Sequence, residues 1–244
     1  MSIKTDALMI RVTKVGEADR FVTALTRDLG LVRASAKGAQ KAKSKNNAAT
    51  SLLAYSKITL IESHEKYVIT EAQPERLFYS FGSDISSLAL AQYFCEIAGV
   101  LCPWDEPAEF SLRLLLNSLH FLTEGQKDPR LLKAVTELRL LAEAGYMPNL
   151  TACAACGEDS SPLYFSPVKG TLLCEQCTPP SGDICLAPAT LEAMRHILSC
   201  PLEKIFQFSV SDDVLAQLAH VTESFLLCQL NRGFKTLDFY HSIH

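Results

Sequence analysis

Four cysteines, arranged as two CxxC pairs, are the side chains whose types and spacing most clearly indicate chemistry. Cys153 and Cys156 form the first pair, and Cys174 and Cys177 form the second, with seventeen residues between Cys156 and Cys174. This spacing is typical of a zinc site with four thiolate ligands. Four thiolates complete the tetrahedral shell of Zn²⁺ and leave no position for water or substrate, so the predicted ion is structural. Four free thiols or a redox dithiol are the alternatives, and a redox dithiol usually has a single CxxC at a strand-to-helix junction.

Basic side chains are concentrated at the start of the chain, where they would suit a polyanion. Residues 1–50 hold ten Lys and Arg against four Asp and Glu, whereas the other 194 residues hold thirteen against twenty-three. The candidate DNA-contacting residues are Arg11, Lys14, Arg20, Arg33, Lys37, Lys41, Lys43 and Lys45. If about five of them contact phosphates, the affinity for single strands should fall with salt at a log–log slope near −3.5.

Three of these lysines lie in segment 38–51, which has no acidic residue and no apolar side chain larger than alanine. We expect such a segment to be a loop that does not pack tightly. Its place after a basic strand favours DNA binding, and a solvated flexible linker is the alternative. Phe21, Tyr55 and Tyr67 are candidate base-stacking residues, for which a place in the core is the alternative.

Alternating patterns in the first 80 residues predict five short strands, the number found in a small barrel such as an OB-fold. In the first strand we expect Leu8, Ile10 and Val12 to share one face. In the third strand the small apolar residues should face one way, and Arg33 and Lys37 the other. The predicted strands are 8–13, 20–26, 31–37, 57–62 and 66–71.

From residue 83 onward, the apolar residues follow the spacing of helices. The predicted helices are 83–101, 107–125, 129–144, 188–198 and 211–231, the last with Ser211 as its cap and Gly233 as its stop. The cysteine pairs fall in a non-helical insertion with a short hairpin at 164–173. The predicted fold class is α+β multidomain: an N-terminal OB-fold barrel, then an all-α helical domain with an inserted four-cysteine zinc finger. The predicted domains are 1–80 for the barrel, 81–150 and 181–244 for the helical domain, and 151–180 for the zinc finger.

The remaining sequence features argue against an enzyme and against a membrane protein. The chain has no phosphate-binding glycine loop, no GxSxG and no HExxH motif, and its six histidines show no ligand spacing. It starts without the apolar run of a signal peptide and has no stretch long enough to span a bilayer. We therefore expect a non-enzymatic protein of the cytoplasm, associated with the nucleoid, whose nine cysteines are thiols or metal ligands.

Several short segments occur along the whole chain in an order typical of one family. These segments are Ala7–Arg11, Gly16–Arg20, Leu25–Gly30, Ala36–Ala39, Gly145–Gly157 with the second cysteine pair, and Asn231–Phe239. In their types and order they resemble the RecO family of bacterial DNA repair and recombination mediators. The family's DNA-contacting residues correspond best to Lys37 and Lys41, whereas Gln40 stands where many relatives carry an arginine.

The resemblance implies an OB-fold followed by a helical domain that carries a zinc finger. It further implies binding of single- and double-stranded DNA, annealing of complementary strands, and a partnership with RecR in loading RecA. The DNA onto which RecA is loaded is already coated by single-strand-binding protein. Some members bind the C-terminal tail of that protein through the helical domain.

Two other functions stay open from the residues alone. A zinc-ribbon interaction protein or transcription accessory factor would bind DNA weakly or not at all, and the lysines would then be dispensable. A zinc hydrolase or deaminase would need a water on the metal, for which four cysteine ligands leave no room.

Overall fold

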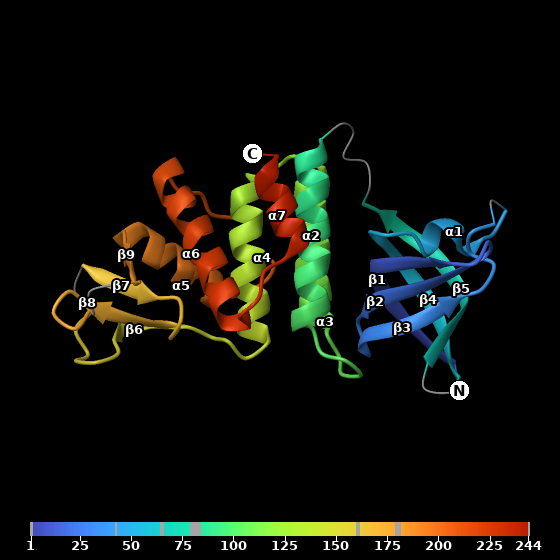
Figure 1. Cartoon of the computed structure of the whole chain (residues 1–244), viewed down its shortest axis with the longest axis horizontal. Helices are drawn as coiled ribbons and strands as arrows, with labels where there is room; N and C mark the ends of the chain where they lie inside the picture. Colours follow the sequence, from blue (N-terminus) through green and yellow to red (C-terminus); the bar gives the residue numbers. More distant parts are fainter. Residues whose placement is uncertain are drawn as a thin grey trace. The chain divides into compact units, whose positions relative to one another are not determined.

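The computed structural model describes two compact units. Figure 1 shows the whole chain, coloured from the N-terminus to the C-terminus. Residues 1–126 and 234–244 form the first unit, and residues 127–233 form the second. The described residues are 2–41, 43–63, 66–78, 84–159, 162–178 and 182–243. The predicted fold class is confirmed. The predicted domain bounds at 80/81 and 180/181 lie outside the described residues, and the bound at 150/151 stays a prediction.

The first unit is built on a closed five-stranded barrel with the strand order β1-β2-β3-β5-β4. All five predicted strands are present and longer than predicted: β1 Ser2–Val15, β2 Asp19–Thr26, β3 Gly30–Ala36, β4 Ala54–Ser63 and β5 Lys66–Leu77. β1 is antiparallel to both β2 and β4. Among the described residues, β3 closes the ring by parallel pairing with β5 at Ala34 and Ser35. Most of one edge of β3 is therefore left for other partners.

A bulge in β1 decides which side chains face the barrel interior. Met9 pairs with Ala24 on β2 and Arg11 pairs with Thr23, so Ile10 is the extra residue. Met9 and, after the bulge, Val12 belong to the barrel core. The predicted common face of Leu8, Ile10 and Val12 is therefore wrong, because one extra residue reverses the alternation.

Segment 38–51 packs more tightly than its composition predicts. Within its described residues, Ala39 and Ala49 are fully buried, and α1 (Asn46–Ala49) lies against β4 and β5. The Asn46 side chain accepts a hydrogen bond from the backbone of Ala72 on β5. Small side chains allow close approach, and hydrogen bonds replace the missing apolar area. The expectation of a loosely packed loop is wrong at Ala39 and over α1.

Three helices complete the first unit: α2 Ile85–Leu101, α3 Glu109–Thr123 and α7 Lys235–Ser242. α2 and α3 lie against β1 and β2, as Figure 1 shows for α2 and the barrel. They bury one half of the outer barrel face, including Leu8, Ile10 and Leu25. The other half of this face, toward the far ends of β1, β2 and β3, stays exposed. The sequence did not indicate α7, which packs on α2 with Phe234 edge-on to Tyr93.

The second unit combines α4 Pro129–Glu143, α5 Pro188–Ser199 and α6 Asp212–Leu230 with a small sheet. The helix starts differ in their caps: the Asp128 side chain caps α4, whereas Ser211 makes no side-chain cap hydrogen bond to α6. Asn231, in the left-handed conformation, ends α6 instead of the predicted Gly233. Within the described part of the chain, every helix is too short or too polar to span a membrane.

α4 and α6 are joined by a buried charged cluster. Lys133 Nζ lies 2.8 Å from Glu137 Oε1 and 2.6 Å from Glu223 Oε2, and Thr222 Oγ1 donates to Glu137 Oε2 at 2.7 Å. Lys133 and Glu137 are almost fully buried. The attraction of the two carboxylates outweighs the desolvation of the amine, so the pKa of Lys133 is raised.

Candidate metal centre and nucleic-acid interface

The four predicted cysteine ligands come together in one cluster. The Sγ atoms of Cys153, Cys156, Cys174 and Cys177 all lie within 4.8 Å of one another. The Sγ atoms of Cys156 and Cys174 are 3.6 Å apart. Zinc–sulfur bonds of about 2.3 Å in a tetrahedron separate the sulfurs by about 3.8 Å, so the cluster has the size of a single metal shell. The residues fit a metal site.

Two parallel neighbouring strands bring the cysteine pairs together. Cys153 ends β6 (Asn149–Cys153), and Cys174 ends β8 (Thr171–Cys174), which runs beside it. Each pair then turns back on itself: the Gly157 amide donates to the Cys153 carbonyl at 2.9 Å, and the Cys177 amide donates to the Cys174 carbonyl at 3.0 Å. Gly157 has a φ of +81°, which favours glycine at the first turn.

The backbone around Cys153 favours the thiolate form that a metal ion requires. Hydrogen bonds from the backbone of Cys174, and then of Cys156 and Ala155, lower the pKa of the Cys153 thiol to about 6. Such N–H groups stabilise a thiolate before any cation is bound. The pKa values of the Cys156 and Cys177 thiols are raised instead, because their side-chain hydrogen bonds to neighbouring sulfurs of the cluster favour the protonated form.

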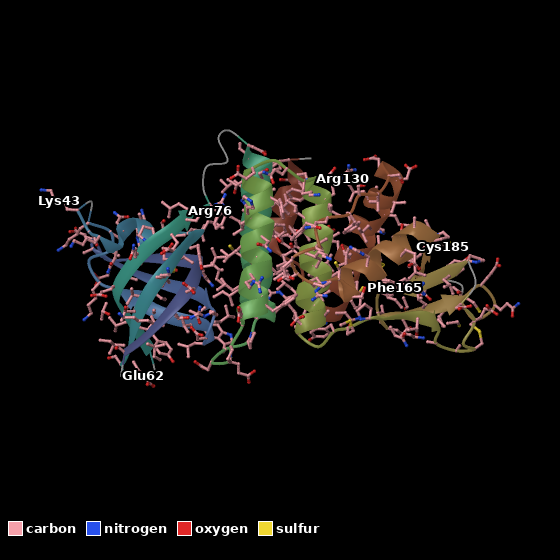
Figure 2. All side chains as sticks on the ribbon, turned by 180° about the vertical axis from the view of Figure 1, so that it is seen from behind. Lys43, Glu62, Arg76, Arg130, Phe165 and Cys185 are labelled. Atoms are coloured by element: carbon pink, nitrogen blue, oxygen red, sulfur yellow. The ribbon has the colours of Figure 1, made fainter. Side chains whose placement is uncertain are left out.

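The hairpin under the cysteines packs its apolar side chains against α6. The predicted hairpin is confirmed as β7 (Leu163–Ser166) and β8, and β9 (Ile184–Leu186) extends the sheet to the order β6-β8-β7-β9. Phe165, labelled in Figure 2, is fully buried and lies edge-on to Phe225 of α6, with 5.3 Å between ring centroids. The hairpin is therefore held in place by packing that does not involve the cysteine sulfurs.

On the barrel, strand register brings three of the predicted basic residues to one surface. Arg11 pairs with Thr23 on β2, and Thr23 pairs with Arg33 on β3, so the two arginines lie in one row across the exposed half of the outer face. Lys37 follows β3 directly and is exposed. Phe21 occupies the neighbouring row, opposite Ser35, and is 43% exposed. The expected common face of Arg33 and Lys37, opposite the small apolar residues, agrees with the core packing of β3.

The other predicted basic residues lie at the end of the barrel next to α1. Lys41, Lys43 and Lys45 are exposed, and Lys43 points away from the barrel in Figure 2. Lys14 is exposed and pairs in register with Arg20. The surface formed by Arg11, Arg33, Lys37, Lys41, Lys43 and Lys45, together with Lys14, is called the basic surface below.

Arg20 differs from the other seven because its guanidinium is used inside the protein. Its Nη1 donates to the Asn47 carbonyl at 2.7 Å, and its Nη2 donates to Asn47 Oδ1 at 3.0 Å. This contact fastens α1 to the start of β2. Arg20 lies next to Lys14 of the basic surface, but its hydrogen bonds hold α1 and β2 together, a role called the structural clamp below.

Across the described residues, none of the eight predicted side chains forms an ion pair with a carboxylate. Other cations of the barrel do: Arg27 pairs with Asp6 at 2.9 Å, and Lys57 pairs with Glu75 at 3.2 Å. The positive charge of the basic surface is therefore available to an outside anion.

The sequence interpretation missed one aromatic residue at this surface. Trp104, in the link between α2 and α3, is 43% exposed, and the Arg33 guanidinium lies over its ring at 5.1 Å. No sequence pattern marks it, because its position depends on how the link lies on β3. Of the three predicted stacking residues, Phe21 is at this surface, Tyr67 packs against the barrel core, and Tyr55 is half-buried on β4.

Comparison with known proteins gives matches along nearly the whole chain. A family model described as "Recombination protein O N terminal" matches residues 1–78, and one described as "Recombination protein O C terminal" matches residues 82–238. A protein named "DNA repair protein RecO" from Acetivibrio thermocellus is 32% identical over 241 residues, which cover 97% of this chain and 95% of that protein. Proteins of the same name from Symbiobacterium thermophilum and Dehalococcoides mccartyi are 30% and 32% identical, covering 96% and 88% of this chain and 94% and 85% of their own lengths.

Proposed function

Because the chain belongs to the RecO family of DNA repair proteins, we propose that it is a non-catalytic mediator that binds DNA through its barrel. It binds single- and double-stranded DNA, anneals complementary strands, and helps RecR to load RecA. Its membership of the family confirms the resemblance seen in the sequence. The finer activities rest on that resemblance together with the basic surface.

The observation that carries the proposal is the unpaired positive charge of the basic surface. Seven exposed cations lie on one side and one end of a small barrel, and no carboxylate of the described chain pairs with them. Phosphate contacts of this kind supply affinity without sequence preference, which suits a protein that must act on any strand. Half of the face is closed by helices, so the DNA path is limited to the open half.

We further propose that the four cysteines hold Zn²⁺. Zn²⁺ accepts four thiolate ligands in a tetrahedron, and the sulfur spacing of the cluster matches its bond lengths. With its shell filled by Cys153, Cys156, Cys174 and Cys177, the ion would supply folding energy and no chemistry. The cluster and the basic surface belong to different units. The proposed DNA binding therefore does not require the ion to contact DNA, and a structural role is sufficient for it.

The proposed protein partners are RecR and the C-terminal tail of single-strand-binding protein. Both rest on the family resemblance, which assigns the tail to the helical part of the molecule. The proposed place of action is the nucleoid of the cytoplasm.

The test is strand annealing without ATP, measured with bare strands and with strands coated by single-strand-binding protein. The triple variant Lys37→Glu, Lys41→Glu, Lys43→Glu should lose both DNA binding and annealing. The matched control is Lys169→Glu, Lys204→Glu, Lys235→Glu, which makes the same change in net charge at three exposed lysines elsewhere. The control should anneal like the wild type.

Equal loss in both variants would show that net charge, and not the basic surface, controls binding. If the folded test variant binds and anneals as well as the wild type, the barrel proposal is wrong. The zinc-ribbon interaction protein would then be the better explanation.

A further inference from the structure

We propose that Trp104 is a binding site for an unpaired base of single-stranded DNA, with Arg33 beside it to contact the adjacent phosphate. This inference rests on the proposed DNA binding and adds to it a site that discriminates single strands from duplex. It is carried by the rigid placement of an exposed indole ring at the edge of the basic surface.

The link that carries Trp104 is fixed firmly to β3. The Leu31 amide donates to the Pro103 carbonyl at 2.8 Å, and Trp104 forms bridge pairs with Gly30 and Leu31. A further hydrogen bond of 3.0 Å runs from the Ala108 amide to the Arg27 carbonyl. The link uses the edge of β3 that β5 leaves open.

Gly30 makes this close approach possible. Its φ is +60°, and a Cβ atom at this position would lie 2.3 Å from the Pro103 carbonyl oxygen and 2.5 Å from that of Glu106. Any other residue would push the link away from the strand. The backbone of Trp104 is thus held in a defined place, although its ring stays 43% exposed.

An exposed ring on a fixed backbone is suited to stacking. Tryptophan usually buries its large apolar surface, and here the ring is left accessible beside Arg33 and not beneath the helices. The Arg33 guanidinium lies 5.1 Å from the ring centroid and is itself exposed, so it can hold the ring and still reach a phosphate. Bases stack on such aromatic and guanidinium planes without sequence preference.

The neighbouring charges indicate which way the strand passes the ring. Asp105 and Glu106 follow Trp104 and are exposed, and Asp105 is close enough to Tyr67 of β5 to contribute, after burial, to raising its pKa. Asp105 therefore lies toward the β5 side. Arg33 and, in the same row, Arg11 lie toward β1 and β2, so the phosphates should pass on that side of the ring.

Because Trp104 is the single tryptophan of the chain, its fluorescence reports on this site alone. We would titrate the wild-type protein with an oligothymidylate and with an abasic oligonucleotide of the same length. The oligothymidylate should quench the emission in a saturable way, whereas the abasic strand should bind more weakly and leave the emission nearly unchanged. In parallel, fluorescence anisotropy of a labelled strand measures binding independently of the tryptophan.

The Trp104→Ala variant should bind the oligothymidylate about 5- to 150-fold more weakly, the range for loss of one stacked base. Trp104→Phe should recover most of this loss, because a phenyl ring also stacks. Phe239→Ala, which removes a 49% exposed aromatic ring on α7, is the matched control and should bind like the wild type. None of the variants should weaken binding of the abasic strand.

The outcomes separate this inference from the proposed function. Binding seen by anisotropy with unchanged tryptophan emission would overturn the Trp104 site and leave the DNA-binding proposal intact. Equal quenching by both strands would also overturn it, since charge and not a base would then cause the change. Absence of any binding would reject the proposed function and the Trp104 site together, and the wild-type titration decides these points even if Trp104→Ala does not fold.

Discussion

Replacing Lys37, Lys41 and Lys43 by alanine should reduce the salt dependence of single-strand binding by a predictable amount. The three side chains are exposed and form no ion pair within the described chain, so each is available to neutralise one phosphate. Each phosphate contact adds about 0.7 to the log–log slope for single strands. If all seven residues of the basic surface make contact, the slope is about −4.9, and the variant should retain about −2.8. The difference of about 2.1 does not depend on how many of the other four residues take part.

The assay is equilibrium binding of a labelled oligothymidylate at several salt concentrations. A fourfold change in salt, from about 50 to about 200 mM, should shrink the affinity gap between the wild type and the variant roughly 20-fold. Alanine at Lys169, Lys204 and Lys235 provides the control with equal net charge. If the log–log slopes of the wild type and the variant differ by less than about 0.7, the assignment of these lysines to phosphate contacts is refuted, even if the affinity itself falls.

Three further predictions concern the remaining parts of the fold. If the wild type binds one equivalent of zinc as proposed, the Cys174→Ser variant should bind none, and hydrogen exchange should quicken in both cysteine turns but not in the β7–β8 hairpin. Faster exchange throughout the second unit would contradict this. Burial raises the pKa of the Cys95 and Cys102 thiols to about 12, so both should resist alkylation at pH 8 in the native protein. Stability measured by urea unfolding should also decline above about pH 9, because the unfolded thiols ionise there while the folded ones stay protonated. Lys133→Ala should lower the free energy of unfolding by about 3–5 kcal/mol, because Glu137 is left buried without its cation, whereas Lys133→Met with Glu137→Leu should recover most of the loss.

The sequence predicted the number of barrel strands and their positions because alternation is a local property. It could not predict the bulge at Ile10, since an extra residue in β1 is defined only by its pairing with β2. For the same reason, the predicted common face of Leu8, Ile10 and Val12 is wrong. The sequence did not predict α7, because this short helix is stabilised by packing on α2, which is far away in the sequence.

The two candidate sites differ in how far spacing alone determines them. The predicted metal ligands are two short-range pairs, and the turn geometry within each pair follows from the two intervening residues. The sequence therefore identified all four cysteines that the structure gathers. The basic surface depends on the register between strands, and this register cannot be read from the composition or the alternation of a single strand. Trp104 depends further on a glycine in a different element, because Gly30 lets the α2–α3 link lie on β3.

Arg20 shows why residue type is a weaker guide than geometry, and its role can be tested directly. Both ends of its guanidinium are bound to Asn47, and the amide of Asn47 also donates to the Lys41 carbonyl at 3.3 Å. Arg20→Ala should lower the free energy of unfolding by about 1.5–3 kcal/mol, because the Asn47 carbonyl loses a charged donor, and should leave the salt slope unchanged. Arg11→Ala, in the neighbouring strand, should reduce the slope by about 0.7 with little effect on stability. A slope change for Arg20→Ala without destabilisation would mean that Arg20 contacts phosphate and is no clamp. A slope change together with the expected destabilisation would mean that DNA displaces the clamp when a strand binds.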